Sequence, residues 1–276
     1  MLDPVAPFPA AEYRARCEAI QSRMASAGLD ALLLTLPADI YYVTGFLTRF
    51  WESPTRPWFV IVRGSGEPVA VIPAIGGDLM ARTWVEDIRT WPSPDPQDDG
   101  IGLLSDTLCE IVPEKGRIGV PMGAETHLRM PLAGYSALSK TIAPRRLLDG
   151  SDAIRGAREI KSEAEIDRVR ETCRIAGAAF AKVPRFAGRG ATSLEVFRSF
   201  QIALLEAGAD WVSYVAGGAG PDGYGDVISP AGDRALAKGD VLMLDTGAVR
   251  AGYFCDFDRN WAVGRPSDAV RRAHDA

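Results

Sequence analysis

Three aspartates interrupt two neighbouring β-prone runs near the end of this sequence. Residues 239–249 read Gly-Asp-Val-Leu-Met-Leu-Asp-Thr-Gly-Ala-Val, and residues 252–261 read Gly-Tyr-Phe-Cys-Asp-Phe-Asp-Arg-Asn-Trp. The short segment between them predicts a β-hairpin. Aspartate is rare inside strands, and a buried carboxylate needs a partner. Any fold of this chain must therefore accommodate Asp245, Asp256 and Asp258.

The hairpin geometry predicts that the three carboxylates share one face. We centre the turn on Arg250 and Ala251. Asp245 and Asp256 then lie directly opposite each other, with Cβ atoms about 5 Å apart, and strand alternation brings Asp258 to the same face. Like charges so close repel unless a cation lies between them, and carboxylate oxygens suit a divalent cation. The alternative is a solvated sheet face that carries three acids.

A second interpretation, in which the Asp-Thr-Gly triplet belongs to an aspartic protease, is not supported because the triplet occurs once. Aspartic proteases carry this triplet too, but they need a second copy, and the sequence has none. We therefore set this class aside.

Composition limits the classes of protein that the chain can belong to. Its 276 residues are 47% hydrophobic and 24% charged, which is ordinary for one large or two smaller globular domains. A net charge of -5 without a basic run argues against nucleic-acid binding. No apolar run approaches the length of a membrane span, and residues 1–7 lack the features of a signal peptide. Four scattered cysteines predict reduced thiols in a cytoplasmic protein.

The first half of the chain alternates between helix and strand patterns, which predicts an α/β domain. We expect helices at 10–27, 77–85 and 101–111, and strands at 29–35, 58–62, 69–72, 87–91 and 117–120. The pattern over 40–46 favours neither helix nor strand.

The second half begins near residues 150–160. Ser162 and Glu165 form a capping-box signature at the start of a helix, and a second helix runs from Thr192 to Gly208. We expect a strand at 211–215 and then a mobile glycine-rich loop at 216–223.

The chain resembles the creatinase/prolidase/methionine aminopeptidase family, the pita-bread metallohydrolases, in its Xaa-Pro aminopeptidase and dipeptidase branch. The resemblance lies in Asp-Thr-Gly at 245–247 followed by Gly-Tyr-x-x-Asp-x-x-Arg at 252–259. Weaker likenesses lie at 28–34, 39–46, 117–120 and 158–166. The resemblance implies an α/β creatinase-like N-terminal domain at 1–153 and an α+β pita-bread catalytic domain, here incomplete, at 154–276.

The resemblance also implies a metal site. Asp245 and Asp256 would be metal ligands, and Asp258 and Arg259 would support them from outside the ligand set. The complete enzyme would hold two divalent ions (Mn, Co, Zn or Fe) that polarise a carbonyl and lower the pKa of water. No catalytic side chain is assigned.

A homodimer is a further implication of the resemblance. The segment Arg49-Phe50-Trp51 is a candidate for reaching the neighbour's active site. The alternative is an exposed loop with aromatic anchors.

Two departures from the family pattern bear on activity. The family peptidases have a histidine in the loop before the hairpin, whereas this chain has only His127 and His274. Tyr224 and Asp226 are candidate substitutes, although a plain loop role is the simpler interpretation of both. The later ligands, a histidine and two glutamates, are missing, and the last helix runs to the end without a cap. We therefore expect a C-terminally truncated, inactive fragment.

These observations predict a metal-dependent hydrolase resembling Xaa-Pro aminopeptidase or dipeptidase, acting on a small peptide. Two alternatives stay open. One is a family member that hydrolyses a small amide or amidine, as creatinase or ectoine hydrolase does. The other is a metal-free binding pseudo-enzyme.

Overall fold

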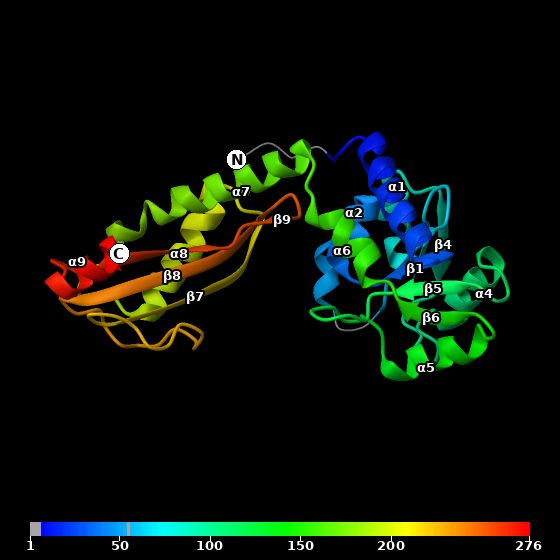
Figure 1. The fold of residues 1–276 in the computed structure, drawn as a ribbon. Coiled ribbons are helices and arrows are strands. Elements are labelled where there is room, and N and C mark those ends of the chain that lie inside the picture. The colour runs from blue at the N-terminus through cyan, green and yellow to red at the C-terminus, as the bar shows by residue number, and fades with distance from the viewer. Residues whose placement is uncertain (1–6, 54–55) are drawn as a thin grey trace. The chain divides into compact units, whose positions relative to one another are not determined.

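The computed structural model describes residues 7–53 and 56–276, so the start of the chain, where we looked for a signal peptide, lies outside it. The chain divides into two compact units, one ending at Ile160 and the other formed by Lys161–Ala276. Figure 1 shows the order of the elements. Within the described ranges, no helix combines the length and the apolar character that crossing a membrane requires.

The first unit is built on one six-stranded sheet of mixed direction, ordered β4-β3-β2-β1-β5-β6. Its strands are β1 (Ala31–Leu34), β2 (Phe59–Arg63), β3 (Val69–Pro73), β4 (Asp87–Trp91), β5 (Arg117–Val120) and β6 (Arg146–Asp149). Its helices are α1 (Ala10–Ala27), α2 (Pro37–Thr44), α3 (Gly77–Met80), α4 (Ile101–Ile111), α5 (Leu132–Thr141) and α6 (Ser151–Glu159), with short 3-10 turns η1 (Arg49–Glu52) and η2 (Ala74–Gly76).

Most of the predicted elements of this unit are confirmed, with two differences. The undecided stretch at 40–46 falls mainly in helix α2, because Pro37 opens its first turn and Gly45 closes it with a φ of 77°. The helix expected at 77–85 is only the single turn α3, since Thr83 Oγ1 turns back to the carbonyl of Met80.

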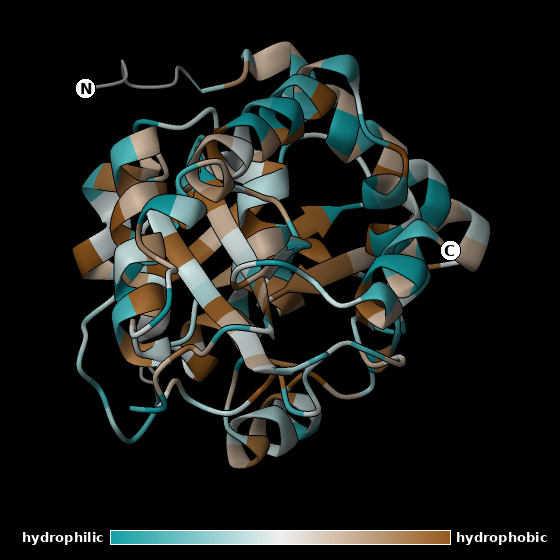
Figure 2. Ribbon diagram, turned by 90° about the vertical axis from the view of Figure 1, so that its left-hand side faces the viewer, coloured by the Kyte–Doolittle hydropathy of each residue, from teal (hydrophilic) through white to brown (hydrophobic). Residues whose placement is uncertain are grey.

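Helices cover both faces of this sheet. Leu32 and Leu34 of β1 enter a core shared with α1, α2 and α6, whereas Leu33 enters a second core shared with α4 and α5. Because both faces are buried, the strand is a continuous apolar run without alternation. Figure 2 shows helices that carry both hydrophilic and hydrophobic residues, as helices do when one face packs on a core.

The second unit places helices on one face of an antiparallel sheet ordered β10-β8-β7, with β9 also paired to β8. Its strands are β7 (Trp211–Pro221), β8 (Asp240–Arg250), β9 (Tyr253–Phe254) and β10 (Phe257–Ala262). Its helices are α7 (Glu163–Phe180), α8 (Ser193–Ala207) and α9 (Asp268–Asp275), with the 3-10 turn η3 (Val183–Arg185). The capping box at Ser162 and the helix start at Thr192 are confirmed, and Thr192 also forms a capping box with Glu195.

Strand β7 corrects the prediction of a mobile loop at 216–223. The strand continues to Pro221, with Ala216–Pro221 paired against Asp240–Asp245 of β8. The glycines here serve close backbone approach, since a Cβ on Gly217 would lie 2.3 Å from the carbonyl oxygen of Met243. Glycine-rich composition alone cannot distinguish such a strand from a loop.

The helix-covered face of this sheet is held by aromatic packing around Phe180 at the end of α7. Its ring centroid lies 4.8 Å from that of Phe200 on α8 and 5.2 Å from that of Phe257 on β10. Phe180 is 4% exposed. It therefore ties both helices to the strand that carries Asp258 and directly follows Asp256.

We predict that Phe180→Ala destabilises the second unit by about 3–5 kcal/mol, because it removes a buried ring and leaves a cavity. Leu205→Ala is the matched control, since Leu205 is 50% exposed and its truncation is expected to change stability by less than about 0.5 kcal/mol. Urea denaturation followed by circular dichroism measures both. Equal effects of the two substitutions would contradict the assigned role of Phe180.

Candidate metal site

A tight turn fixes which residues of the hairpin face each other. Ala251 and Gly252 have φ values of 50° and 76°, so they form a two-residue loop closed by the pair Arg250 and Tyr253. Asp210 holds this turn, because its carboxylate accepts hydrogen bonds at 2.6 Å from the Arg250 guanidinium and from the Ala251 amide. The turn is therefore centred one residue further along the chain than predicted.

The turn position corrects the predicted pairing of the aspartates. Asp258, and not Asp256, lies directly opposite Asp245. Asp256 falls across from Gly247, because the flanking pairs join Phe254 to Val249 and Phe257 to Thr246. The shift moves each partner by two residues, so each side chain keeps its face of the sheet.

The carboxylates of Asp245 and Asp256 meet at the hydroxyl of Tyr214 on β7. This hydroxyl donates to Asp256 Oδ1 at 2.5 Å and to Asp245 Oδ1 at 3.2 Å. Burial raises the pKa of the Tyr214 phenol, and the hydrogen bond to Asp256 and the charges of both carboxylates raise it further. Tyr214 is thus a neutral donor at pH 7, held between one half-buried and one exposed carboxylate.

The sequence patterns do not single out Tyr214. It lies within the strand predicted at 211–215, but no motif marked it. The signal that was present is a tyrosine on the strand neighbouring the Asp-Thr-Gly strand, and it becomes informative only once the strand order is known.

Each residue of the Asp-Thr-Gly triplet has its own structural task. Asp245 supplies a carboxylate, and the fully buried Thr246 donates from Oγ1 to the carbonyl of Tyr214 at 3.1 Å. A Cβ on Gly247 would lie 2.5 Å from Cε1 of Tyr214 and 2.4 Å from Cζ of Phe254. Glycine therefore leaves the space in which the phenol reaches the two carboxylates.

Asp258 and Arg259 occupy opposite faces of β10. Asp258 faces the same side as Asp245, its direct partner. The Arg259 guanidinium lies 4.8 Å from the ring centroid of Phe257 and 6.0 Å from that of Phe180, on the helix-covered face. Arg259 donates to the Asp258 carbonyl at 2.6 Å. The structure therefore does not bring the Arg259 side chain to the aspartates.

The oxygen atoms of Asp245, Asp256 and Tyr214 are of a type that can bind a divalent cation. Carboxylate and phenol oxygens are hard ligands of the kind preferred by Mn²⁺ and similar ions. Cys255, beside Asp256, packs into the helix-covered core instead, where burial raises its pKa to about 11. Within residues 7–53 and 56–276, no group of three or more histidine, cysteine, aspartate or glutamate side chains is arranged to hold a metal. The pair therefore fits as part of a ligand set.

The predicted substitutes for the missing loop histidine lie in a turn. Asp226 Oδ1 accepts hydrogen bonds from the amides of Ile228 and Ser229, and hydrogen bonding by Ser229 lowers the pKa of Asp226. Tyr224 is 39% exposed. His274 lies on α9, with its Nδ1 3.3 Å from the carboxylate of Asp275. The plain loop role is thus the better description of Asp226.

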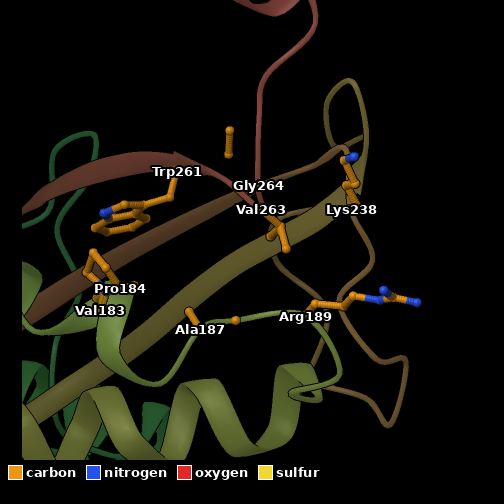
Figure 3. Close-up of a pocket in the computed structure, with 10 residues that line it drawn as sticks. Val183, Pro184, Ala187, Arg189, Lys238, Trp261, Val263 and Gly264 are labelled. Carbon is orange, nitrogen blue, oxygen red and sulfur yellow. The ribbon is translucent and has the colours of Figure 1, made fainter.

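A cavity of about 440 Å³ at the end of β10 lies apart from the carboxylate pair, since neither Asp245 nor Asp256 lines it. Figure 3 shows Trp261 and Pro184 at one end of it and Lys238 and Arg189 at the other.

The segment Arg49-Phe50-Trp51 forms η1 in the first unit. The Trp51 ring packs against Phe46 and Trp58, with centroid distances of 5.4 and 5.5 Å, so it anchors this turn to the core. Phe50 is more exposed, at 37%. A role for the segment in a neighbour's active site stays a prediction.

Two family models match the chain in succession. The creatinase/prolidase N-terminal domain matches residues 16–160, more than half of the chain, and metallopeptidase family M24 matches residues 167–276. The chain therefore belongs to the creatinase/prolidase family of M24 metallohydrolases, which generally use divalent metal ions, and the predicted family and two-part fold class are confirmed.

The similar proteins include peptidases. The probable dipeptidase PepE of Mycobacterium tuberculosis is 27% identical over 272 residues, which cover 97% of this chain and 68% of that protein. The crystal structure of dipeptidase PepE from Mycobacterium ulcerans superposes with a TM-score of 0.77 at 25% identity, covering 98% of this chain and 70% of the other. The prolidase from Thermococcus sibiricus has a TM-score of 0.80 at 23% identity, with 95% and 69% covered, and shows the same fold.

We predict that Gly247→Ala destabilises the second unit by about 1–3 kcal/mol, because the added methyl overlaps the rings of Tyr214 and Phe254. Gly177→Ala is the matched control. Nothing lies within 4 Å of its added Cβ, and alanine is expected to stabilise helix α7 by about 0.5–1 kcal/mol. Thermal unfolding distinguishes the two. A stabilising Gly247→Ala substitution would show that the rings do not need this space.

Proposed function

We propose that Asp245 and Asp256 are the metal-ligating carboxylates of a metal-dependent peptidase, with Asp258 beside them. The observation that carries the proposal is that both carboxylates, one from β8 and one from the residue just before β10, reach one hydroxyl group within 3.2 Å. Two like charges so placed need a shared positive or proton-donating partner. In a chain of the M24 family, a divalent cation is the natural candidate.

The proposed cofactor is a pair of divalent ions, Mn, Co, Zn or Fe, in the complete ligand set. Such ions polarise a substrate carbonyl and lower the pKa of water. The chain's own part is to hold one carboxylate on β8 and the other at the start of β10, both supported by the aromatic core beneath. Rigid placement keeps the ligands in position without ordering cost at the moment of binding.

The proposed substrate is a small peptide with an Xaa-Pro bond. Support comes from the names of similar proteins, a probable dipeptidase and a prolidase. The second candidate is a small amide or amidine. It is favoured by the absence of a histidine from the loop before β8, where this chain has Tyr224 and Asp226.

Four further expectations stay predictions. They are the division into domains at 1–153 and 154–276, the homodimer, the cytoplasmic location, and the inactivity of this chain by itself. The first rests on sequence pattern together with the resemblance, and the others on composition or resemblance.

We predict that the chain binds Mn²⁺ and that Asp245→Ala or Asp256→Ala lowers the affinity at least about tenfold, because each removes a charged ligand. Asp233→Ala is the control, since Asp233 is an exposed loop carboxylate. Elemental analysis after gel filtration, together with titration calorimetry, measures the binding. Unchanged binding in both variants would reject this pair as ligands, and no Mn²⁺ binding by the unchanged chain would favour the metal-free binding protein.

We predict that any turnover by the Mn²⁺-loaded chain is greatest with Ala-Pro when Ala-Pro, Ala-Ala and creatine are compared. Proline release that disappears in Asp256→Ala supports the peptidase and contradicts the predicted inactivity of this chain. Turnover of creatine without proline release favours the small-amide alternative. Metal binding without turnover of any of the three is the result expected of an inactive fragment.

A further inference from the structure

The Tyr214 hydroxyl stands at the one point that both candidate ligand carboxylates share. Its contacts are with the Oδ1 atoms of Asp256 and Asp245, at 2.5 and 3.2 Å. A phenol has a single proton, so the two contacts are unequal branches of one bifurcated hydrogen bond. The phenol therefore supplies one donor to two negatively charged acceptors.

The backbone of β7 is deformed at Tyr214. Val212 pairs with Ala248 and Val215 pairs with Thr246, so Ser213 and Tyr214 together stand opposite one residue of β8. This is a β-bulge, which puts an extra residue into one strand and can re-aim a side chain.

Residues of β8 and β9 hold the bulge in place. The Thr246 hydroxyl holds the Tyr214 carbonyl at 3.1 Å, and the missing side chain of Gly247 gives the ring its space. The Phe254 ring lies 6.3 Å from the Tyr214 ring, centroid to centroid. The phenol is thus held toward the carboxylates by three neighbours from β8 and β9.

A phenol donor and a cation have the same electrostatic effect on this pair of carboxylates. Each lowers the repulsion between two carboxylates that the hairpin holds together. An Oδ1 lone pair that accepts the Tyr214 hydrogen bond is not free, in the same direction, to bind a cation. Binding of a cation between the two Oδ1 atoms therefore requires that the hydroxyl give up this hydrogen bond.

We propose that Tyr214 is a positioning residue that holds Asp245 and Asp256 together in the metal-free protein and gives way when a cation binds. The inference rests on the proposed function, in which these two aspartates are the ligands. It makes Tyr214 a competitor of the metal rather than one of its ligands. The protein thereby keeps a formed carboxylate pair at the expense of metal affinity.

The first test measures Mn²⁺ affinity by the electron paramagnetic resonance signal of the free ion. We expect Tyr214→Phe to bind Mn²⁺ about tenfold more tightly than the unchanged chain, because the competing hydrogen bond to charged acceptors is gone. Tyr135→Phe, which removes a phenol hydroxyl from α5 in the first unit, should leave the affinity unchanged. Weaker binding by Tyr214→Phe would make Tyr214 a ligand, and equal binding would make it a packing residue. Either result overturns the inference.

The second test uses the metal-free protein in chelator and needs no metal binding at all. We expect Tyr214→Phe to lower the melting temperature by about 3–6 °C, because two carboxylates lose their shared donor. In the Asp245→Asn/Asp256→Asn variant the acceptors are neutral. There, Tyr214→Phe should lower the melting temperature by less than half as much. Equal losses in both backgrounds would overturn the bridging role.

The two tests separate the two proposals. Suppose that the unchanged chain does not bind Mn²⁺, but Tyr214→Phe lowers the melting temperature more in the unchanged chain than in the Asp245→Asn/Asp256→Asn variant. The proposed metal function then fails, and the role of Tyr214 in holding the carboxylates together stands. If the chain binds Mn²⁺ through Asp245 and Asp256, but Tyr214→Phe lowers the melting temperature equally in both backgrounds, only the inference about Tyr214 fails.

Discussion

Two carboxylates held next to each other on one sheet face repel, and much of the second unit serves to keep them there. Asp245 is on β8 and Asp256 lies at the entrance to β10, and the tight turn between these strands fixes their offset. Asp210 fastens that turn through Arg250 and the Ala251 amide. The hairpin cannot slip by one residue without turning the carboxylates to the other face, which the aromatic side chains of the core already fill.

The two faces of this sheet have different roles. On the helix-covered face, Phe180, Phe257 and Trp261 pack together, and Arg259 lies against the first two rings. On the other face lie the carboxylates and Tyr214. An apolar face provides the stability that a charged face cannot supply, because exposed like charges contribute no burial energy and repel each other. The motif Gly-Tyr-x-x-Asp-x-x-Arg therefore combines residues of both faces: its aspartate serves the site, and its arginine serves the packing.

Membership of the M24 family gives the carboxylates their chemical meaning, but the local structure adds something that the family motif does not contain. A bulge in β7 places Tyr214 over Gly247, and the Thr246 hydroxyl holds the bulged backbone. Asp-Thr-Gly thus supplies one carboxylate of the proposed metal site, one hydroxyl that holds the neighbouring backbone, and one space for a neighbouring ring. Each of these tasks depends on a strand that is more than twenty residues away in the sequence.

The sequence by itself determined the family, the two-part α/β organisation, the capping box at Ser162, the helix start at Thr192, and the common face of the aspartates. These follow from local patterns or from parity along a strand, both of which a linear sequence contains. Only the tertiary structure decided that Asp258 and not Asp256 opposes Asp245, that 216–221 is strand, and that Tyr214 joins the carboxylates. Turn register depends on how Asp210 meets the turn, a glycine-rich strand depends on its partner, and a bulge depends on both paired strands. All three are set by contacts between distant residues, which is why local pattern could not supply them.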